Sequence, residues 1–101
     1  LTAEEKKVVG SYERKTGQRF KLAFLENGKS EKWFNGAKLE DETWKIVGKE
    51  VHVSSITVNG FSRVYKIEIN GDLTQVASII AEVRMDQEDK LLQWAYKKLK
   101  Q

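Results

Sequence analysis

The fold is decided by residues 19–36, RFKLAFLENGKSEKWFNG. Apolar and polar side chains alternate through the first seven of them, so Phe20, Leu22 and Phe24 share one face of an extended strand. An Asn-Gly pair follows this strand, and a second pair ends the stretch. Asn-Gly favours the type I′ turn because both residues tolerate positive φ. The stretch therefore predicts strands that fold back on one another at tight turns.

The same pattern continues along the rest of the chain. Two further Asn-Gly pairs stand at residues 59–60 and 70–71, and the chain has no Pro that would confine a strand to a sheet edge. Shorter strands are predicted at 11–15 and 30–34. In the longer strands, alternation predicts that one face carries Trp44 and Ile46, Val51 and Val53, and Tyr65, Ile67 and Ile69. Four Asn-Gly signals in so short a chain predict an antiparallel up-and-down meander of hairpins.

The beginning of the chain has a different pattern. Thr2-Ala3-Glu4-Glu5 fits the capping box, in which Thr2 caps a helix and Glu5 bonds back to the cap. Gly10 can end such a helix, because Gly is common just after a helix C-terminus. We therefore expect a helix of one or two turns before the first strand.

The last third of the chain, from residue 72 onwards, fits two structures. Val76, Ile79, Ile80 and Val83 recur at helical spacing, which would place a C-terminal helix on the sheet and give an α+β domain. The same third also fits two strands, over Leu73–Ile80 and Leu91–Leu99, the second of which would bury Leu92, Trp94 and Tyr96 in alternation. We favour the strands because the preceding strands leave a sheet edge that later strands can pair with.

Length and composition restrict the class of protein. The 101 residues form one domain, residues 1–101, with 33% charged residues and a net charge of +3. This small excess is spread along the chain, which argues against a nucleic-acid-binding patch. No apolar run approaches the roughly 20 residues of a membrane-spanning helix. The sequence begins at Leu1 and not at Met, so we expect a processed or trimmed chain, and whether an upstream signal or lipid anchor was removed stays open.

No catalytic or metal-binding pattern emerges. His52 is the single histidine and there is no Cys, which excludes the usual zinc sites. On one strand face His52 lies between Glu50 and Ser54, but residues two apart project in parallel and do not form a catalytic triad. Residues 23–30 fit a relaxed phosphate-loop pattern without the helix that this loop requires. We expect a protein that is not an enzyme and has no cofactor.

Gly10-Ser11-Tyr12 stands where lipocalins have Gly-x-Trp, directly after a short N-terminal helix and at the start of the first strand. The segments 25–29 and 44–53 have the form of repeated strand-turn-strand units. In these features the chain resembles a lipocalin-like (calycin-like) domain of small bacterial envelope proteins and lipoproteins. The resemblance implies a partly or fully closed barrel and the binding of an apolar ligand. It implies no reaction.

Aromatic residues form 10% of the chain, and a curled sheet would gather several of them on its concave face. There they either fill the core or line a ligand pocket. For the pocket we predict Trp33, Trp44, Tyr65 and Trp94 as ligand-binding residues.

The functional hypothesis is a non-enzymatic binding or structural module of the bacterial cell envelope, or a secreted one, with a cytoplasmic protein as the alternative. Its partner would be a small apolar ligand or a protein. A second hypothesis is a module that binds single-stranded nucleic acid, with exposed aromatic rings that stack on bases and lysines that contact phosphates.

Overall fold

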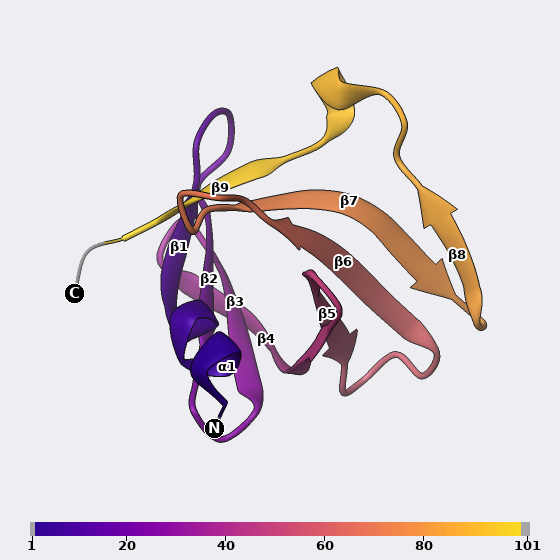
Figure 1. Cartoon of the computed structure of the whole chain (residues 1–101), viewed down its shortest axis with the longest axis horizontal. Helices are drawn as coiled ribbons and strands as arrows, with labels where there is room; N and C mark the ends of the chain where they lie inside the picture. The colour runs from indigo at the N-terminus through magenta and orange to yellow at the C-terminus, as the bar shows by residue number, and fades with distance from the viewer. Residues whose placement is uncertain (1, 100–101) are drawn as a thin grey trace.

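The computed structural model describes residues 2–99, which form one curled antiparallel sheet and one short helix (Figure 1). The helix α1 spans Ala3–Val8, and a single 3-10 turn, η1, spans Lys90–Leu92. The strands are β1 (Gly10–Arg14), β2 (Phe20–Phe24), β3 (Lys29–Phe34), β4 (Ala37–Val47), β5 (Glu50–Ser55), β6 (Phe61–Ile67), β7 (Leu73–Ile80), β8 (Val83–Asp86) and β9 (Ala95–Lys98).

The sheet closes into an eight-stranded barrel. Strands β1 to β7 pair in chain order, and β9 then pairs with both β7 and β1. Strand β8 pairs with β7 alone among the described strands and stands outside the ring. The expected mainly β meander with a short N-terminal helix is therefore confirmed. The alternative of a C-terminal helix packed on the sheet is wrong, because residues 72–99 hold three strands and only one 3-10 turn.

Three of the four Asn-Gly pairs turn the chain in two different ways, whereas Asn59-Gly60 ends the longer loop between β5 and β6. Asn35 and Gly36 both have positive φ, 51° and 83°, as the predicted type I′ turn requires. At 27–28 and 70–71 only the glycine has positive φ, and the loop is one residue longer. There the Asn Oδ1 accepts a hydrogen bond from the backbone N–H two residues further on, at 3.0 Å in both turns. In these two turns the hydrogen bond of the Asn side chain stabilises the turn, and only the glycine adopts the left-handed conformation.

The core fills the half of the barrel next to α1. Its members are buried apolar side chains from the barrel strands and from the end of α1: Val8, Tyr12, Leu22, Phe24, Trp44, Val51, Val53, Tyr65, Leu73 and Tyr96. Phe24 lies edge-to-face between Tyr12 and Trp44, at centroid distances of 5.4 and 5.7 Å. The polar tips of these two rings are satisfied, because Tyr12 donates to the Val8 carbonyl and Trp44 to the Leu25 carbonyl. The inward faces predicted for β2, β4 and β5 are confirmed.

The structure corrects three details of the expected elements. Ile69 does not continue the inner face of β6, because the chain already turns between Glu68 and Gly71 and leaves Ile69 exposed. The last strand is shorter than predicted, since an Asp89-capped 3-10 turn occupies residues 90–92 and leaves Leu92 exposed. Strand β1 begins at Gly10, one residue earlier than predicted, whereas the expected position of Gly10 directly after the helix C-cap Val9 is confirmed.

The turn between β7 and β8 is strained. Ala81 and Glu82 have φ of 50° and 67°, although neither residue favours the left-handed region.

The double substitution Ala81→Asn with Glu82→Gly should raise the free energy of unfolding by about 1 kcal/mol, because it supplies the residues that a type I′ turn prefers. Urea denaturation measures the change. The reverse exchange, Asn35→Ala with Gly36→Glu, should lower stability by a similar amount. Equal stability of the first double variant and the parent would contradict the strain.

An ion pair ties β8 to β5 on the outside of the barrel. The Arg84 guanidinium contacts both carboxylate oxygens of Glu50, at 2.8 and 2.7 Å, and lowers the pKa of Glu50 to about 2. A carboxyl with a lowered pKa stabilises the fold above its unfolded pKa and loses this effect as the pH falls through its folded pKa. We expect Glu50→Gln to lower the free energy of unfolding by about 1 kcal/mol at pH 7. The loss should become smaller as the pH falls from 4.5 to about 2. Denaturation curves across this range, with Glu26→Gln as the surface control, test it; a cost independent of pH would contradict it.

Candidate ligand-binding site at the open end of the barrel

The two ends of the barrel differ. At one end α1 lies beside the β4–β5 turn, where Glu4 and Lys7 share a surface hollow with Gly48 and Lys49. The apolar core fills this end. The loops between β1 and β2, β3 and β4, β5 and β6, and β7 and β8 all lie at the other end, since neighbouring strands run in opposite directions. We call this second end the open end.

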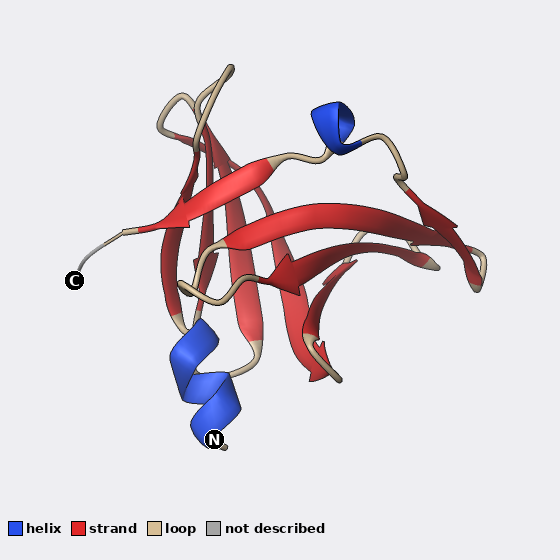
Figure 2. Cartoon of the chain, turned by 45° about the horizontal axis from the view of Figure 1, so that its top comes forward, coloured by secondary structure: helices blue, strands red, loops and turns tan. Residues whose placement is uncertain are grey.

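The barrel wall opens between β8 and β9. Strand β9 pairs with β7 at Leu73 and Thr74, and the Gln75 N–H still bonds to the Trp94 carbonyl, whereas from Val76 onwards β7 bonds to β8 and to Gln87, which follows it. Val64 of β6 pairs with Ala77 and Tyr65 with Gln75, so Val76 has no counterpart on β6 and forms a β-bulge in β7. The bulge lies where the neighbour of β7 changes from β9 to β8. The turn η1 lies between the ends of β8 and β9, apart from the ring (Figure 2). The two strands therefore leave a gap in the wall.

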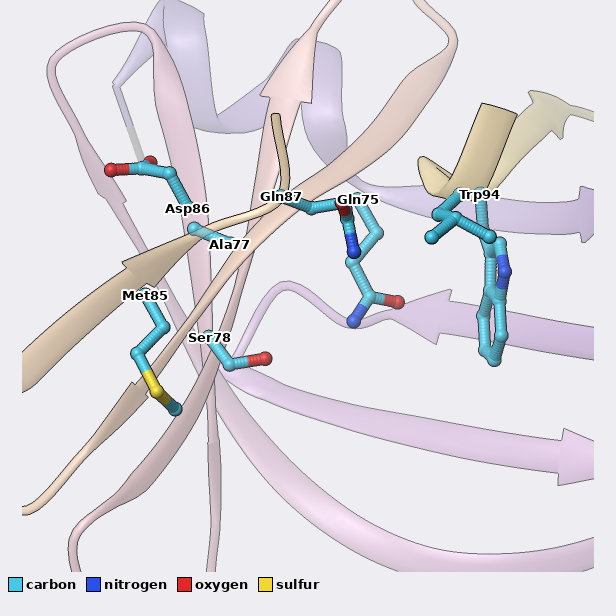
Figure 3. A pocket seen from close by; sticks show the side chains of 8 residues that line it. Gln75, Ala77, Ser78, Met85, Asp86, Gln87 and Trp94 are labelled. Carbon is cyan, nitrogen blue, oxygen red and sulfur yellow. The ribbon is translucent and has the colours of Figure 1, made fainter. Parts of the chain in front are cut away.

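A cavity of about 340 Å³ occupies this gap. It is lined by Gln75, Ala77, Ser78, Met85, Asp86, Gln87, Leu92 and Trp94. Figure 3 shows Gln75, Met85 and the Trp94 ring pointing to the same side, while Asp86 points away. Within the ladder Ser78 pairs with Met85 on β8 and with Arg63 on β6. Paired residues project from the same face of a sheet, so the cavity adjoins the inside of the barrel.

A buried ion pair lies inside the barrel beside this cavity. Arg63 on β6 donates from Nη2 to Glu42 Oε1 on β4 at 2.5 Å, and both side chains are almost fully buried. Both face inwards because each lies two residues before a core aromatic, Tyr65 and Trp44 respectively. Arg63 and Tyr65 are the cross-strand partners of the cavity residues Ser78 and Gln75. The ion pair and the cavity are therefore neighbours.

Several polar atoms around the ion pair have no partner. Within residues 2–99, no hydrogen bond reaches the buried atoms Ser30 Oγ, Glu42 Oε2, Arg63 Nε and Tyr65 Oη. Buried polar atoms in proteins are nearly always bonded to protein, water or ligand, so each such atom requires an explanation. The set contains a cationic donor, an anionic acceptor and two hydroxyls, which can bond a polar group of a ligand or water.

Burial perturbs the ionisation of this cluster. It raises the pKa of the Glu42 carboxyl, and the charge of Arg63 only partly opposes the rise. The pKa of Lys32, which lies on β3, is lowered by burial and by the positive charge of Arg63. Burial also raises the pKa of the Tyr65 hydroxyl. The inside of the barrel is thus a poorly solvated environment in which charges interact strongly.

Aromatic rings and cations alternate around the open end. The Trp94 ring stacks on Phe20 at 6.2 Å, and Phe20 contacts Phe34 at 4.9 Å between centroids. The Arg14 guanidinium lies 4.0 Å from the Trp94 centroid, and Lys32 Nζ lies 5.1 Å from that of Phe20. We call Phe20, Phe34 and Trp94 the aromatic rim. Cations held against ring faces in this way are partly removed from water and remain available to an anion.

The structure separates the four predicted ligand-binding residues. Trp44 and Tyr65 are core residues, and Trp94 belongs to the aromatic rim and lines the cavity. The expectation that Trp33 shares their concave face is wrong. It alternates with the inward-facing Lys32 and Phe34, and it lines an outer hollow with Lys21 and Glu31 instead.

Sequence reasoning missed the charged interior residues, which are Arg14, Lys32, Glu40, Glu42 and Arg63. Extension of the predicted inward faces by one step of two residues reaches Glu42 from Trp44 and Arg63 from Tyr65. Alternation therefore contains this signal for two of them. Residue type hides it, because charged residues ordinarily lie on the solvent face.

The remaining candidate motifs do not form sites within the described residues. His52 Nε2 lies 3.3 Å from Glu50, but the Ser54 hydroxyl bonds with Ser62, so no triad forms. Residues 23–30 form a hairpin between β2 and β3 without a following helix. Across residues 2–99 no cluster of three potential metal ligands is found. In the same range no helix has the length and apolar character needed to cross a membrane.

Comparisons with known proteins identify no relative. No protein-family model matches the chain, and neither a curated protein nor a solved structure gives a significant match.

Removal of one partner of the buried ion pair should reduce the stability of the fold strongly, whereas replacement of both partners by apolar residues should reduce it little. Arg63→Met leaves the Glu42 carboxylate buried without its partner and should reduce stability by about 3 kcal/mol. The double substitution Arg63→Met with Glu42→Leu should recover most of this loss, because it removes both charges. Urea denaturation of the three proteins measures the difference. Lys38→Met, which breaks surface ion pairs with Glu31 and Asp41, is the control and should cost less than about 1 kcal/mol. A double variant as unstable as Arg63→Met would contradict the prediction.

Proposed function

We propose that the protein is a non-enzymatic binding module that holds a small, largely apolar ligand at the open end of its barrel. The observation that carries the proposal is the cavity between β8 and β9. It contains Met85, Leu92 and Trp94, of which 50%, 58% and 38% of the surface is exposed. Apolar side chains that line a hollow and remain accessible are a typical feature of ligand sites.

The size and composition of the cavity support this proposal. Its volume of about 340 Å³ lies at the lower end of the range of small-molecule sites, roughly 300–1,000 Å³. Four of its eight lining residues are apolar, and the other four, Gln75, Ser78, Asp86 and Gln87, are polar. In ligand sites polar groups orient the ligand, whereas apolar contacts supply much of the affinity.

The core restricts where such a ligand can bind. Buried apolar side chains fill the half of the barrel next to α1. A ligand of this protein would therefore lie across the open end and the wall gap, not deep along the barrel axis. This arrangement agrees with a lipocalin-like module reduced in size. Kinship with lipocalin-like proteins and a place in the bacterial envelope are parts of the proposal that rest on the resemblance of Gly10-Ser11-Tyr12 and the hairpin units.

The nucleic-acid alternative has less support from the geometry. Its stacking platform would need exposed aromatic rings on one face. Trp94 lies at the cavity between β8 and β9, whereas Trp33 lies in the hollow formed by the outer face of β1–β3. The two rings therefore lie at different hollows and do not form one stacking platform.

Tryptophan fluorescence tests the proposal. Titration with decanol, decylamine and decanoate below their micelle concentrations should give a saturable shift with at least one of them, because Trp94 lines the cavity. The shift should persist in Trp33→Phe, whose ring lies on the outer face, and disappear in Trp94→Phe.

Calorimetry of the same titrations provides a second measurement. Ser78→Leu should fill the cavity and weaken binding about tenfold or more, because its side chain would occupy the space next to Met85. If none of the three compounds binds to the parent protein by either method, the proposal is wrong.

A further inference from the structure

We propose that the ligand of this barrel carries an anionic oxygen group, such as a carboxylate, which is held inside the open end by Arg63 and Lys32. This inference rests on the function proposed above and names the chemistry of its ligand. It starts from the unpartnered polar atoms next to the cavity, and not from the cavity itself.

The number of charges inside the open end favours an anion. Three cationic side chains face inwards there, those of Arg14, Lys32 and Arg63. Two carboxylates face them, Glu40 and Glu42, which alternate with Trp44 on the inner face of β4. Three positive charges against two negative charges leave an excess of one positive charge in a poorly solvated place. One bound carboxylate would balance it.

Hydrogen-bonding capacity favours the same ligand class. Arg63 uses Nη2 on Glu42, whereas its Nε is buried and without a partner among the described residues. The hydroxyls of Ser30 and Tyr65 are buried and unpartnered within the same described range. A carboxylate accepts from all three types of donor, and bonds from arginine to a carboxylate are among the strongest in proteins. A purely apolar ligand would leave these atoms without partners.

The strand register places the cavity next to these donors. Arg63 and Tyr65 are cross-strand partners of Ser78 and Gln75, which line the cavity on its inner side. An amphipathic molecule can therefore place its head group at Arg63 while its apolar tail lies against Met85, Leu92 and Trp94. The aromatic rim is adjacent, since the Trp94 ring stacks on Phe20.

The ionisation of Lys32 agrees with this arrangement. Burial and the nearby Arg63 charge both lower the pKa of Lys32, as expected at a site with uncompensated positive charge. The charges of Glu42 and of Glu40, the cross-strand partner of Lys32 on β4, only partly oppose this lowering of the pKa.

A set of ligands with one tail and different head groups tests the inference. Decanoate, decanol, decylamine and acetate are titrated into the full chain and followed by calorimetry. Decanoate should bind about tenfold or more tightly than decanol and decylamine, because only its head group is an anion that forms charge-assisted bonds with the cationic donors. Acetate should show no saturable binding, because it lacks the tail.

Variants at Lys32 and Glu40 make the test independent of the stability of the Arg63–Glu42 pair. Lys32→Met should weaken decanoate about tenfold and leave decanol unchanged. Lys21→Met on the outer face of β2 is its matched control and should change neither. Glu40→Gln removes one interior carboxylate and should tighten decanoate binding several-fold, which a merely structural role of the cluster would not produce.

The outcomes separate the two proposals. If decanol binds as tightly as decanoate, or if Lys32→Met leaves decanoate binding unchanged, the anion inference is wrong and the proposed function stands. The buried atoms then bond water only. If no compound with a decyl tail binds, both proposals fail. A preference for decanoate that requires Lys32 supports both.

Discussion

The structure depends on the closure of the sheet by β9. This short strand bonds to β1 on one side and to β7 on the other. The Asp72 side chain, which directly precedes β7, adds contacts to β9 and to Lys15 after β1. The Asp72 carboxylate accepts from the Lys98 backbone N–H at 3.0 Å and pairs with Lys15 at 2.8 Å, which lowers its pKa. Without this closure β1 would be left with an open sheet edge.

Closure also explains why charged residues can lie inside so small a domain. Glu42 and Arg63 are 21 residues apart, on strands separated by β5, and meet only because the sheet curls. Burial makes each charge costly alone and makes the pair strongly interacting. The apolar half next to α1 supplies stability, which lets the open half carry a charged cluster and exposed aromatic rings. The division of the barrel into a packed half and a polar half is the physical basis of the proposed binding function.

The sequence predicted the local features well and the site only in part. Alternation placed Phe24, Trp44 and Val53 correctly, because one buried face forces a period of two. It failed at Ile69, where the turn began earlier than the apolar pattern suggested. Of the predicted site residues, Trp94 lies at the cavity, but Trp33 lies on the outside. Arg63 and Glu42 were not predicted because their residue types suggest a solvated face.

The sequence by itself therefore determined the turns, the helix cap and the order of the hairpins. These follow from backbone preferences of Asn, Gly and Thr and from side-chain periodicity, which act over a few residues. Tertiary structure decided that β9 would close the ring, that Lys32 and Arg63 would lie within reach of each other's charge, and that a gap would remain between β8 and β9. Such features depend on sheet curvature and on pairing between distant segments, and no short stretch of sequence contains that information.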